Sequence, residues 1–310
     1  MTGLPLSFRR QFLRGELDKH EFSRRMSEHH AALGAHVELL GDSDITAIEL
    51  TKDGITLITR FGGARFPCDA TDRGLPSVVA LDFGSYEAKD FSMLLSLMPR
   101  AGTLIDVGAN IGWYSVHVAL ADSSARVIAI EPVPSSYRWL TAAIAGNALR
   151  NVTALNAAAA AEPGELVLFV DAGISGAASS APSGGETGLE KITCPAVTID
   201  DLVAQHGGVA HVMKLDIEGA EIFALRGAST VLANQRPVVF CEMLRKLTRP
   251  FGYHPNDIIA LMRDHGYACY SAEGDQLVVF TEMGEETTET NFYFLHPEQH
   301  RAELAARTGA

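Results

Sequence analysis

The chain has 310 residues, with 25 Lys and Arg against 38 Asp and Glu, which gives a formal net charge of −13. A hydrophobic share of 47% with 20% charged residues is the composition of a globular protein and excludes a wholly disordered chain. The acidic balance argues against a broad nucleic-acid surface, which needs clustered Lys and Arg. Apolar runs stop well short of the ~20 residues that cross a bilayer.

Cysteine usage and the N-terminus point to a cytoplasmic protein with no membrane partner. The four cysteines form no CxxC pair, so neither a zinc site nor a disulfide framework is predicted. At the N-terminus the positive charges follow the first apolar residues, an order unlike that of a secretory signal.

The first 80 residues predict an extension that precedes the main domain. Between residues 5 and 33, apolar side chains recur at helical spacing and predict one or two amphipathic helices. Three short runs rich in β-branched residues then predict antiparallel strands joined by tight turns, at 37–40, 45–50 and 55–61. The main domain is expected over 81–300 and a tail over 301–310.

Apolar strand-like runs and helical patterns alternate along the main domain. The predicted helices are 82–98, 112–121, 135–148, 220–232 and 255–265. The predicted strands are 103–107, 126–130, 152–156, 211–215 and 237–241, followed by 276–281 and 291–295. Alternation of this kind predicts an α/β fold with a doubly wound, seven-stranded sheet covered on both faces. The last strand is expected to run antiparallel, because a tight connection cannot make a parallel crossover.

One segment interrupts this pattern. Residues 172–188 are largely Gly, Ala and Ser and lie between the apolar runs 166–171 and 192–199. Small side chains cannot form a core, so we expect a loop. It is either a plain connector or a lid that folds over a ligand.

The strongest motif is the Gly-rich segment Asp106-Val-Gly-Ala-Asn-Ile-Gly112, which follows a predicted strand and opens a helix. At such a turn a ligand can approach backbone N–H groups. A dinucleotide fingerprint would need glycine at 108, 110 and 113, but Asn110 and Trp113 stand at two of these positions. The spacing fits a nucleoside without a pyrophosphate, and a purely structural turn is the alternative.

Two further polar positions end predicted strands. Glu131 follows 126–130, where a doubly wound sheet places an acid that holds ribose hydroxyls; a helix cap is the alternative. The segment 214–221, Lys-Leu-Asp-Ile-Glu-Gly-Ala-Glu, brings three acids and a lysine to the end of another strand. Burying carboxylates is costly unless they are paired or used, so this edge is a candidate active site. A helix N-cap is the structural alternative for Asp216 or Glu218.

Together these segments resemble the FkbM family of S-adenosylmethionine-dependent methyltransferases. The resemblance runs from about Gly84 to Leu295 and also involves Glu131-Pro132, Thr198-Ile-Asp-Asp-Leu202 and Asn291-Phe-Tyr-Phe-Leu295. Each motif is modest alone, but their order and spacing are specific. The resemblance implies a class I methyltransferase (Rossmann-like) fold. Its usual chemistry is O-methylation of a small molecule or sugar, of the natural-product type found in secondary metabolism.

The resemblance also implies roles for individual residues toward S-adenosylmethionine. The residues implied to surround its methionine part are Asp106, Gly108, Asn110 and Gly112. Glu131, next to Pro132, is implied to hold the ribose, and Asn156 to lie near the adenine. Asp216 and Glu218 are expected on the sulfonium side, and Tyr86-Glu87 is expected to close over the cofactor.

A hydroxyl acceptor must lose its proton late in the transfer, so a nearby base assists. The candidates are Glu218, Glu242 and His254. The two glutamates rank first because both end strands that face the presumed site, whereas His254 more plausibly starts a helix. Asp216, Glu218 and Glu242 are therefore the predicted catalytic residues, and no metal is expected.

Three other functions remain open at this point. They are an N-methyltransferase acting on an amino acid or peptide-like acceptor, an NAD-dependent oxidoreductase, and a binding module that has lost its chemistry. Asn110 and Trp113 disfavour the oxidoreductase, and the acids at 106, 131 and 216 disfavour the binding module. We expect a small-molecule acceptor and no nucleic-acid partner. The N-terminal extension either shapes acceptor choice or makes a homodimer contact.

Overall fold

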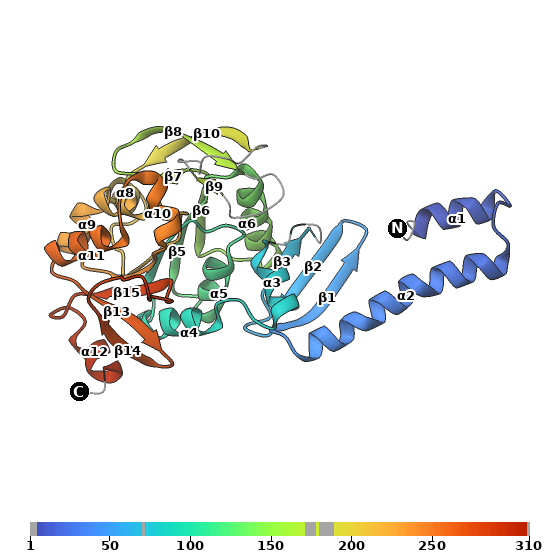
Figure 1. Cartoon of the computed structure of the whole chain (residues 1–310), viewed down its shortest axis with the longest axis horizontal. Helices are drawn as coiled ribbons and strands as arrows, with labels where there is room; N and C mark the ends of the chain where they lie inside the picture. The colour runs from blue at the N-terminus through green and yellow to red at the C-terminus, as the bar shows by residue number, and fades with distance from the viewer. Residues whose placement is uncertain (1–4, 70–71, 73, 171–177, 180–188, 309–310) are drawn as a thin grey trace.

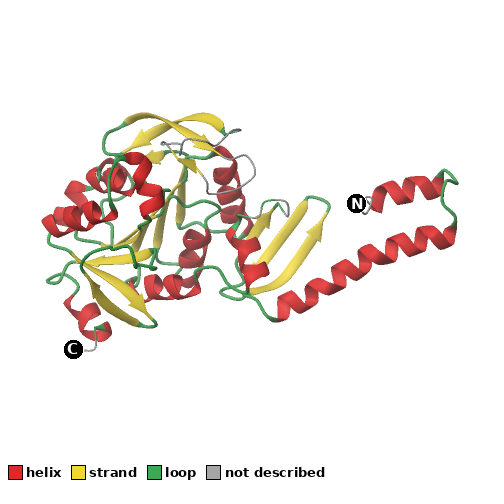
Figure 2. Ribbon diagram, viewed as in Figure 1, coloured by secondary structure: helices red, strands yellow, loops and turns green. Residues whose placement is uncertain are grey.

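The computed structural model describes residues 5–69, 72, 74–170, 178–179 and 189–308. A large sheet with helices on both sides forms the body of the molecule, and the N-terminal helices project away from it (Figure 1). Figure 2 shows the same arrangement by secondary structure, with a small sheet between the projecting helices and the body.

The projecting part is a hairpin of α1 (Pro5–Leu13) and α2 (Lys19–Gly41). Phe12 stacks on Phe22 with ring centroids 4.8 Å apart, which holds the two helices together. Because α2 continues to Gly41, the predicted strand at 37–40 is wrong. Leu33, Val37 and Leu40 recur at helical spacing, and four residues are too few to separate a strand from the last turn of a helix.

The other two predicted strands of the extension are confirmed. β1 (Ile45–Thr51), β2 (Gly54–Thr59) and β3 (Arg65–Cys68) form an antiparallel sheet. The helix predicted over 82–98 is two helices, α3 (Pro76–Phe83) and α4 (Ala88–Leu97). They are separated where Gly84 and Glu87 adopt positive φ values of 90° and 46°, which a continuing helix does not allow.

The central sheet has eight strands in the order β14-β13-β15-β12-β11-β4-β5-β6. Their bounds are β4 (Thr103–Val107), β5 (Arg126–Ile130), β6 (Val152–Leu155), β11 (Val212–Leu215), β12 (Val238–Glu242), β13 (Ala268–Glu273), β14 (Gln276–Phe280) and β15 (Asn291–Leu295). β4, β5, β6, β11 and β12 are parallel, and β15 runs antiparallel to β12, as predicted. The doubly wound α/β fold is confirmed, with one strand more than predicted. The additional strand, β13, lacks Val and Ile and therefore gave no β signal.

Helices and apolar cores cover both faces of this sheet. The helices are α5 (Trp113–Ala121), α6 (Pro134–Gly146), α7 (Ile199–Gln205), α8 (Glu221–Arg226), α9 (Ser229–Asn234), α10 (Arg245–Thr248), the 3-10 helix η1 (Arg249–Phe251), α11 (Pro255–Asp264) and α12 (Arg301–Arg307). Leu104 and Ile105 on β4 belong to different cores, one on each face. The helix predicted over 220–232 is broken between α8 and α9, where a side chain on Gly227 would collide with the carbonyl of Ala160.

A second sheet lies beside the carboxyl ends of the central strands (Figure 1). It consists of β7 (Ala158–Ala159), β8 (Gly164–Val170), β9 (Ala178–Ser179) and β10 (Glu190–Val197) in the order β7-β10-β8-β9. Most of the expected loop or lid at 172–188 lies outside the described residues, apart from the β9 pair. None of the described helices combines the length and apolar character needed to cross a bilayer.

Candidate active site

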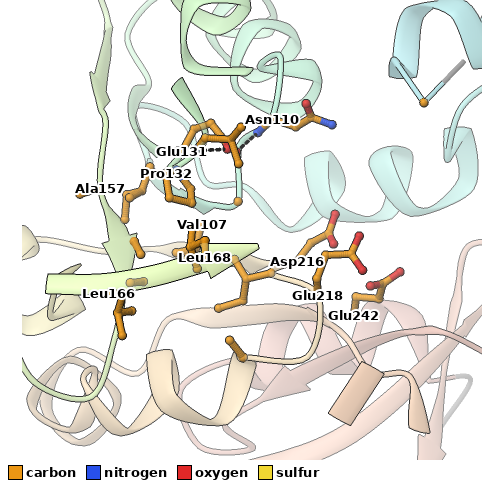
Figure 3. Close-up of a pocket in the computed structure, with 18 of the residues that line it drawn as sticks. Val107, Asn110, Glu131, Pro132, Ala157, Leu166, Leu168, Asp216, Glu218 and Glu242 are labelled. Carbon is orange, nitrogen blue, oxygen red and sulfur yellow. Dashed lines mark hydrogen bonds between the residues drawn. The ribbon is translucent and has the colours of Figure 1, made fainter. Parts of the chain in front are cut away.

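A cavity of about 280 Å³ opens at the carboxyl ends of β4, β5, β11 and β12. From β4 the chain first adds β5 and β6 on one side and later adds β11 and β12 on the other side, so the strand order reverses between β4 and β11. Ligands of doubly wound folds bind at such a point. Figure 3 shows Glu131 and Asn110 at one side of the cavity, the carboxylates of Asp216, Glu218 and Glu242 at the other, and Leu166 and Leu168 of β8 along its length.

The turn between β4 and α5 packs directly against the turn after β11. Gly108 has a φ of 75°, and a Cβ on it would collide with the carbonyl group of Asp216. The Nζ atom of Lys214 donates to the carbonyl oxygen of Gly108 at 3.0 Å. Asn110 also has a positive φ of 50°, and its buried Oδ1 atom accepts no hydrogen bond from the described residues. Asn110 lines the cavity, and its Oδ1 atom is a covered acceptor that the described residues leave unpaired.

Glu131 is almost fully buried and held by the same turn. Its Oε2 atom accepts from the backbone N–H of Asn110 at 2.8 Å, and its Oε1 atom accepts from Val133 N–H at 2.9 Å. Burial raises the pKa of Glu131 to about 7, although these two hydrogen bonds act in the opposite direction. Asn156 donates to the carbonyl oxygens of Glu131 and Pro132 at 2.8 and 3.0 Å. The carboxyl group therefore has one fixed position.

Lys214 is the cation at the centre of the site and is only 5% exposed. Its Nζ atom lies 3.2 Å from Asp216 Oδ2 and 3.7 Å from Asp106 Oδ1. Asp106 is itself buried and accepts a hydrogen bond from Ser115 Oγ at 2.6 Å. Burial opposes the charge on Lys214, but the attraction of Asp216, Asp106 and Glu87 outweighs it and raises the pKa of Lys214.

Four carboxyl groups line the cavity around this lysine: Glu87, Asp216, Glu218 and Glu242. Burial, followed by repulsion from Asp216, raises the pKa of Glu242 to about 9 and that of Glu218 to about 7. The same two causes raise the pKa of Glu87, which accepts a hydrogen bond from Tyr114 Oη at 2.7 Å. Glu218 has a φ of 54°, so its backbone is held in a left-handed conformation at the rim. Crowded, half-desolvated acids with raised pKa values are typical of functional sites.

Comparison with known proteins identifies the family. The sequence profile of the methyltransferase FkbM domain matches residues 106–269, more than half of the chain. The chain belongs to the FkbM methyltransferase family. This membership makes it an S-adenosylmethionine-dependent methyltransferase and decides against the NAD-dependent oxidoreductase.

Similar proteins include the methyltransferase sdnD of Sordaria araneosa, 25% identical over 199 residues, which are 55% of this chain and 75% of the relative. A solved FkbM methyltransferase from Methylobacillus flagellatus is 15% identical with a TM-score of 0.42, and the match covers 73% of this chain and 55% of the other. This chain thus spans about half of that solved protein. A precorrin-6y C5,15-methyltransferase from Geobacter metallireducens is 14% identical with a TM-score of 0.36, covering 68% and 86% of the two chains.

In this FkbM methyltransferase, most of the residues predicted for the site lie around one cavity. Those that line it are Glu87, Gly108, Asn110, Glu131, Pro132, Asp216, Glu218 and Glu242. Asp106, Gly112 and Asn156 do not line it. Asn156 bonds to the backbone of Glu131 and Pro132, which do, and Asp106 pairs with the buried Lys214. Gly112 is needed for packing, since its Cβ would lie 2.6 Å from Leu140 Cδ1. His254 caps α11 by accepting from the N–H of Asn256, which confirms its predicted place at a helix start.

The apolar part of the FkbM cavity was not predicted from the sequence. Ala157, Ala158 and Ala159 line it after β6, and Leu166 and Leu168 line it from β8. The alternation of Leu166 and Leu168 within an apolar run was an available signal for one face of a strand. No pattern in the sequence indicated which face of that strand would be turned toward the cavity.

Proposed function

We propose that this FkbM methyltransferase transfers the methyl group of S-adenosylmethionine to a hydroxyl group of a small organic acceptor, with residues 81–300 as its catalytic domain. One observation carries the proposal. A single cavity joins the turn after β4, the fixed carboxyl group of Glu131 after β5, and the crowded acids after β11 and β12.

The lining of this cavity fits the three parts of the donor. Each oxygen of Glu131 accepts one backbone N–H and keeps a lone pair for a ribose hydroxyl. Asn110, which lines the cavity at the turn after β4, is placed next to the methionine part by this proposal. Leu166 and Leu168 offer an apolar surface to the adenine ring. The bound donor supplies an electrophilic methyl group on a positively charged sulfur.

The acids serve the transfer itself. Methyl transfer is an in-line displacement, so the protein contributes alignment and exclusion of water. Asp216, together with Glu87, stabilises positive charge on the donor. A base works best when its pKa lies near the working pH, and the pKa of about 7 assigns this part to Glu218. Glu242, with a pKa of about 9, is protonated in the free site at neutral pH and is the second candidate.

A second candidate function is N-methylation of an amino acid or peptide-like acceptor. The observation that favours it is the charge of the site: four acids, Glu87, Asp216, Glu218 and Glu242, line the cavity, and its described lining contains no lysine or arginine. Such a surplus of acids attracts an acceptor that carries an amine.

The donor part of the proposal is tested by thermal unfolding with S-adenosylhomocysteine. A ligand that binds only the folded state raises the melting temperature with its concentration. We expect a rise that saturates and that is larger than any change with the same concentration of NAD. An unchanged melting temperature at millimolar S-adenosylhomocysteine would contradict the proposal.

A further inference from the structure

A second cavity, of about 340 Å³, lies next to the candidate donor cavity. Its walls come from four parts of the chain, the first of which contributes Asp44 ahead of β1. β2 and the following turn contribute Thr59 and Phe61, α4 contributes Phe91 and Leu95, and α5 contributes Trp113. The N-terminal extension, which lies outside the region matched by the family profile, thus builds one side of this cavity.

The rings of Phe61, Tyr86, Phe91 and Trp113 line this second cavity. Phe61 meets Phe91 edge to face at 5.3 Å between centroids, and Tyr86 meets Trp113 edge to face at 5.6 Å. Phe61 remains 42% exposed, so the cavity reaches the protein surface at this ring. Aromatic walls of this kind favour a flat ring of a ligand over a flexible chain, because ring faces and edges can pack together.

The polar groups at the base of the cavity are already paired with one another. The Nδ1 atom of His117 lies 2.8 Å from the carbonyl oxygen of Trp113, and its Nε2 atom lies 2.9 Å from Thr59 Oγ1. Burial lowers the pKa of His117 to about 4, so the ring is neutral at physiological pH. Nδ1–H therefore donates to the carbonyl of Trp113, and the hydroxyl proton of Thr59 is shared between Nε2 and the carbonyl oxygen of Phe61, which lies 2.9 Å from Thr59 Oγ1. Neither group is left to bind a polar ligand.

One short segment separates the two cavities. Tyr86 lines both of them, Glu87 lines the donor cavity and Ala88 lines the second cavity. A molecule in the second cavity therefore lies across the Tyr86 ring from the acids proposed for methyl transfer.

We propose that the second cavity holds the apolar, ring-bearing body of the methyl acceptor, whose hydroxyl or amine reaches past Tyr86 to the acids. This inference rests on the proposed function, because it takes those acids as the site of transfer. Deep in the cavity a free sugar would leave hydroxyl groups without hydrogen bonds, which is costly, because Thr59 and His117 are already paired there. The charged residues of the lining, Asp44 and Arg60, have exposed side chains. The acceptor class is therefore a hydroxylated or aminated ring system, and the N-terminal sheet selects it through Phe61 and Thr59.

The test uses 2-naphthol as a probe, because it is a flat bicyclic ring with one hydroxyl group. Trp113 and Trp139 are the two tryptophans of the chain, so a Trp139→Phe variant reports binding through Trp113 fluorescence alone. We expect saturable quenching by 2-naphthol, both without and with saturating S-adenosylhomocysteine, because the two cavities are separate. Calorimetric titration of the unchanged chain gives an independent value of the affinity.

A substitution at the cavity mouth locates the probe. Ser92 lies on α4, is exposed and lines this cavity, so Ser92→Phe fills the opening without disturbing the core. We expect at least a tenfold loss of 2-naphthol affinity. Ser123→Phe, on the exposed turn after α5, adds the same ring away from the cavity and should leave the affinity unchanged.

The outcomes separate this inference from the proposed function. Each variant is also tested for the rise in melting temperature with S-adenosylhomocysteine, which reports on the donor cavity alone. Loss of 2-naphthol binding in Ser92→Phe with a retained rise supports the inference. Equal affinity in Ser92→Phe and the parent, or displacement of 2-naphthol by S-adenosylhomocysteine, would overturn it. Absence of the rise in the unchanged chain would instead count against the proposed function.

Discussion

The Nζ atom of Lys214 lies 3.2 Å from Oδ2 of Asp216, and this ion pair joins the last residue but one of β11 to the acid at the mouth of the cavity. The same nitrogen donates to Gly108 O, so one side chain holds together the turns after β4 and β11. The site is therefore built around a buried charge that does not itself line the cavity.

Lys214→Met tests this arrangement. The change leaves Asp106 and Asp216 without their cation, and removing one partner of a buried ion pair costs about 3–5 kcal/mol. We expect a loss of unfolding free energy of this order in urea denaturation, and weaker binding of S-adenosylhomocysteine. Lys191→Met, at an exposed position of β10, is the matched control and should change neither quantity. A stability equal to that of the control would show that the ion pair contributes nothing.

Gly108→Ala tests the contact between the two turns. Gly108 and Gly63 have similar φ values of 75° and 63°, so alanine at either position has the same backbone penalty, about 1 kcal/mol. Only at Gly108 does the new Cβ meet a neighbour, the carbonyl group of Asp216, whereas nothing lies within 4 Å at Gly63. Gly108→Ala should therefore lose clearly more unfolding free energy than Gly63→Ala, together with its affinity for S-adenosylhomocysteine. Equal losses in the two variants would argue against a required close approach.

Glu131→Gln removes one of the two acceptors that fix this side chain. An amide has one oxygen, so either Asn110 N–H or Val133 N–H would face an NH₂ group and lose its acceptor. An unsatisfied buried group of this kind lowers the free energy of unfolding by about 1–3 kcal/mol. We expect that loss in stability and at least a tenfold loss of S-adenosylhomocysteine affinity by calorimetry. Glu162→Gln, on an exposed turn, serves as the control. An unchanged affinity in Glu131→Gln would mean that this acid does not bind the ribose.

The polar half of the site could be predicted because its residues end strands. Glu131 and Glu242 each follow a continuous apolar run, Asp216 follows the run Val212–Leu215 that only Lys214 interrupts, and the carboxyl ends of parallel strands meet at one edge of a sheet. The turn at Gly108 was visible for the same reason. These features depend on local sequence and on a general rule of the fold, so no long-range packing had to be known.

Long-range packing accounts for what was missed. The role of Lys214 in joining the turns after β4 and β11 could not be inferred, since its contacts with Gly108 and Asp106 join positions more than a hundred residues apart. The segment 37–40 is a separate case, because the apolar residues of four positions fit a short strand and the last turn of a helix equally well. The aromatic cavity beside Tyr86 is formed by β2, α4 and α5. No sequence motif indicates that these three elements come into contact.

His117 gives the structure a dependence on acidic pH. Burial lowers its folded-state pKa to about 4 from an ordinary value of 6.5, so the unfolded chain binds the proton more readily. The stability due to the neutral ring is complete above about pH 6.5 and is lost progressively as the pH falls toward 4. At about 1.4 kcal/mol per pKa unit, the loss amounts to roughly 3 kcal/mol.

His117→Gln removes this titration while keeping a polar side chain next to Thr59. Urea unfolding at a series of pH values between 4 and 7 should show that the difference in unfolding free energy between parent and variant shrinks as the pH falls. Other groups titrate in the same range, but they are common to both proteins and cancel in the difference. A difference that is constant with pH would mean that His117 is not held neutral.

Glu242→Gln tests whether the acids recognise the charge of the donor. S-adenosylmethionine has a positive sulfur and S-adenosylhomocysteine a neutral one, so the ratio of their affinities measures the electrostatic part of binding. Burial and then Asp216 raise the pKa of Glu242 to about 9, so this carboxyl group ionises as the pH rises from 7 to 9. An ionised carboxylate attracts the sulfonium, and the preference for S-adenosylmethionine should increase over this range in the parent protein.

In Glu242→Gln the side chain stays neutral at every pH, so most of that increase should disappear. At pH 9 we expect the preference for S-adenosylmethionine over S-adenosylhomocysteine to be roughly threefold to tenfold lower than in the parent, which is the size expected for one partly buried charge pair. Glu165→Gln, exposed at the start of β8, makes the same chemical change away from the cavity and should retain the full pH dependence. Calorimetry with both ligands measures the ratio without an acceptor. If Glu242→Gln and Glu165→Gln behave alike, the carboxyl group of Glu242 does not sense the sulfonium, and Asp216 with Glu87 must supply that attraction.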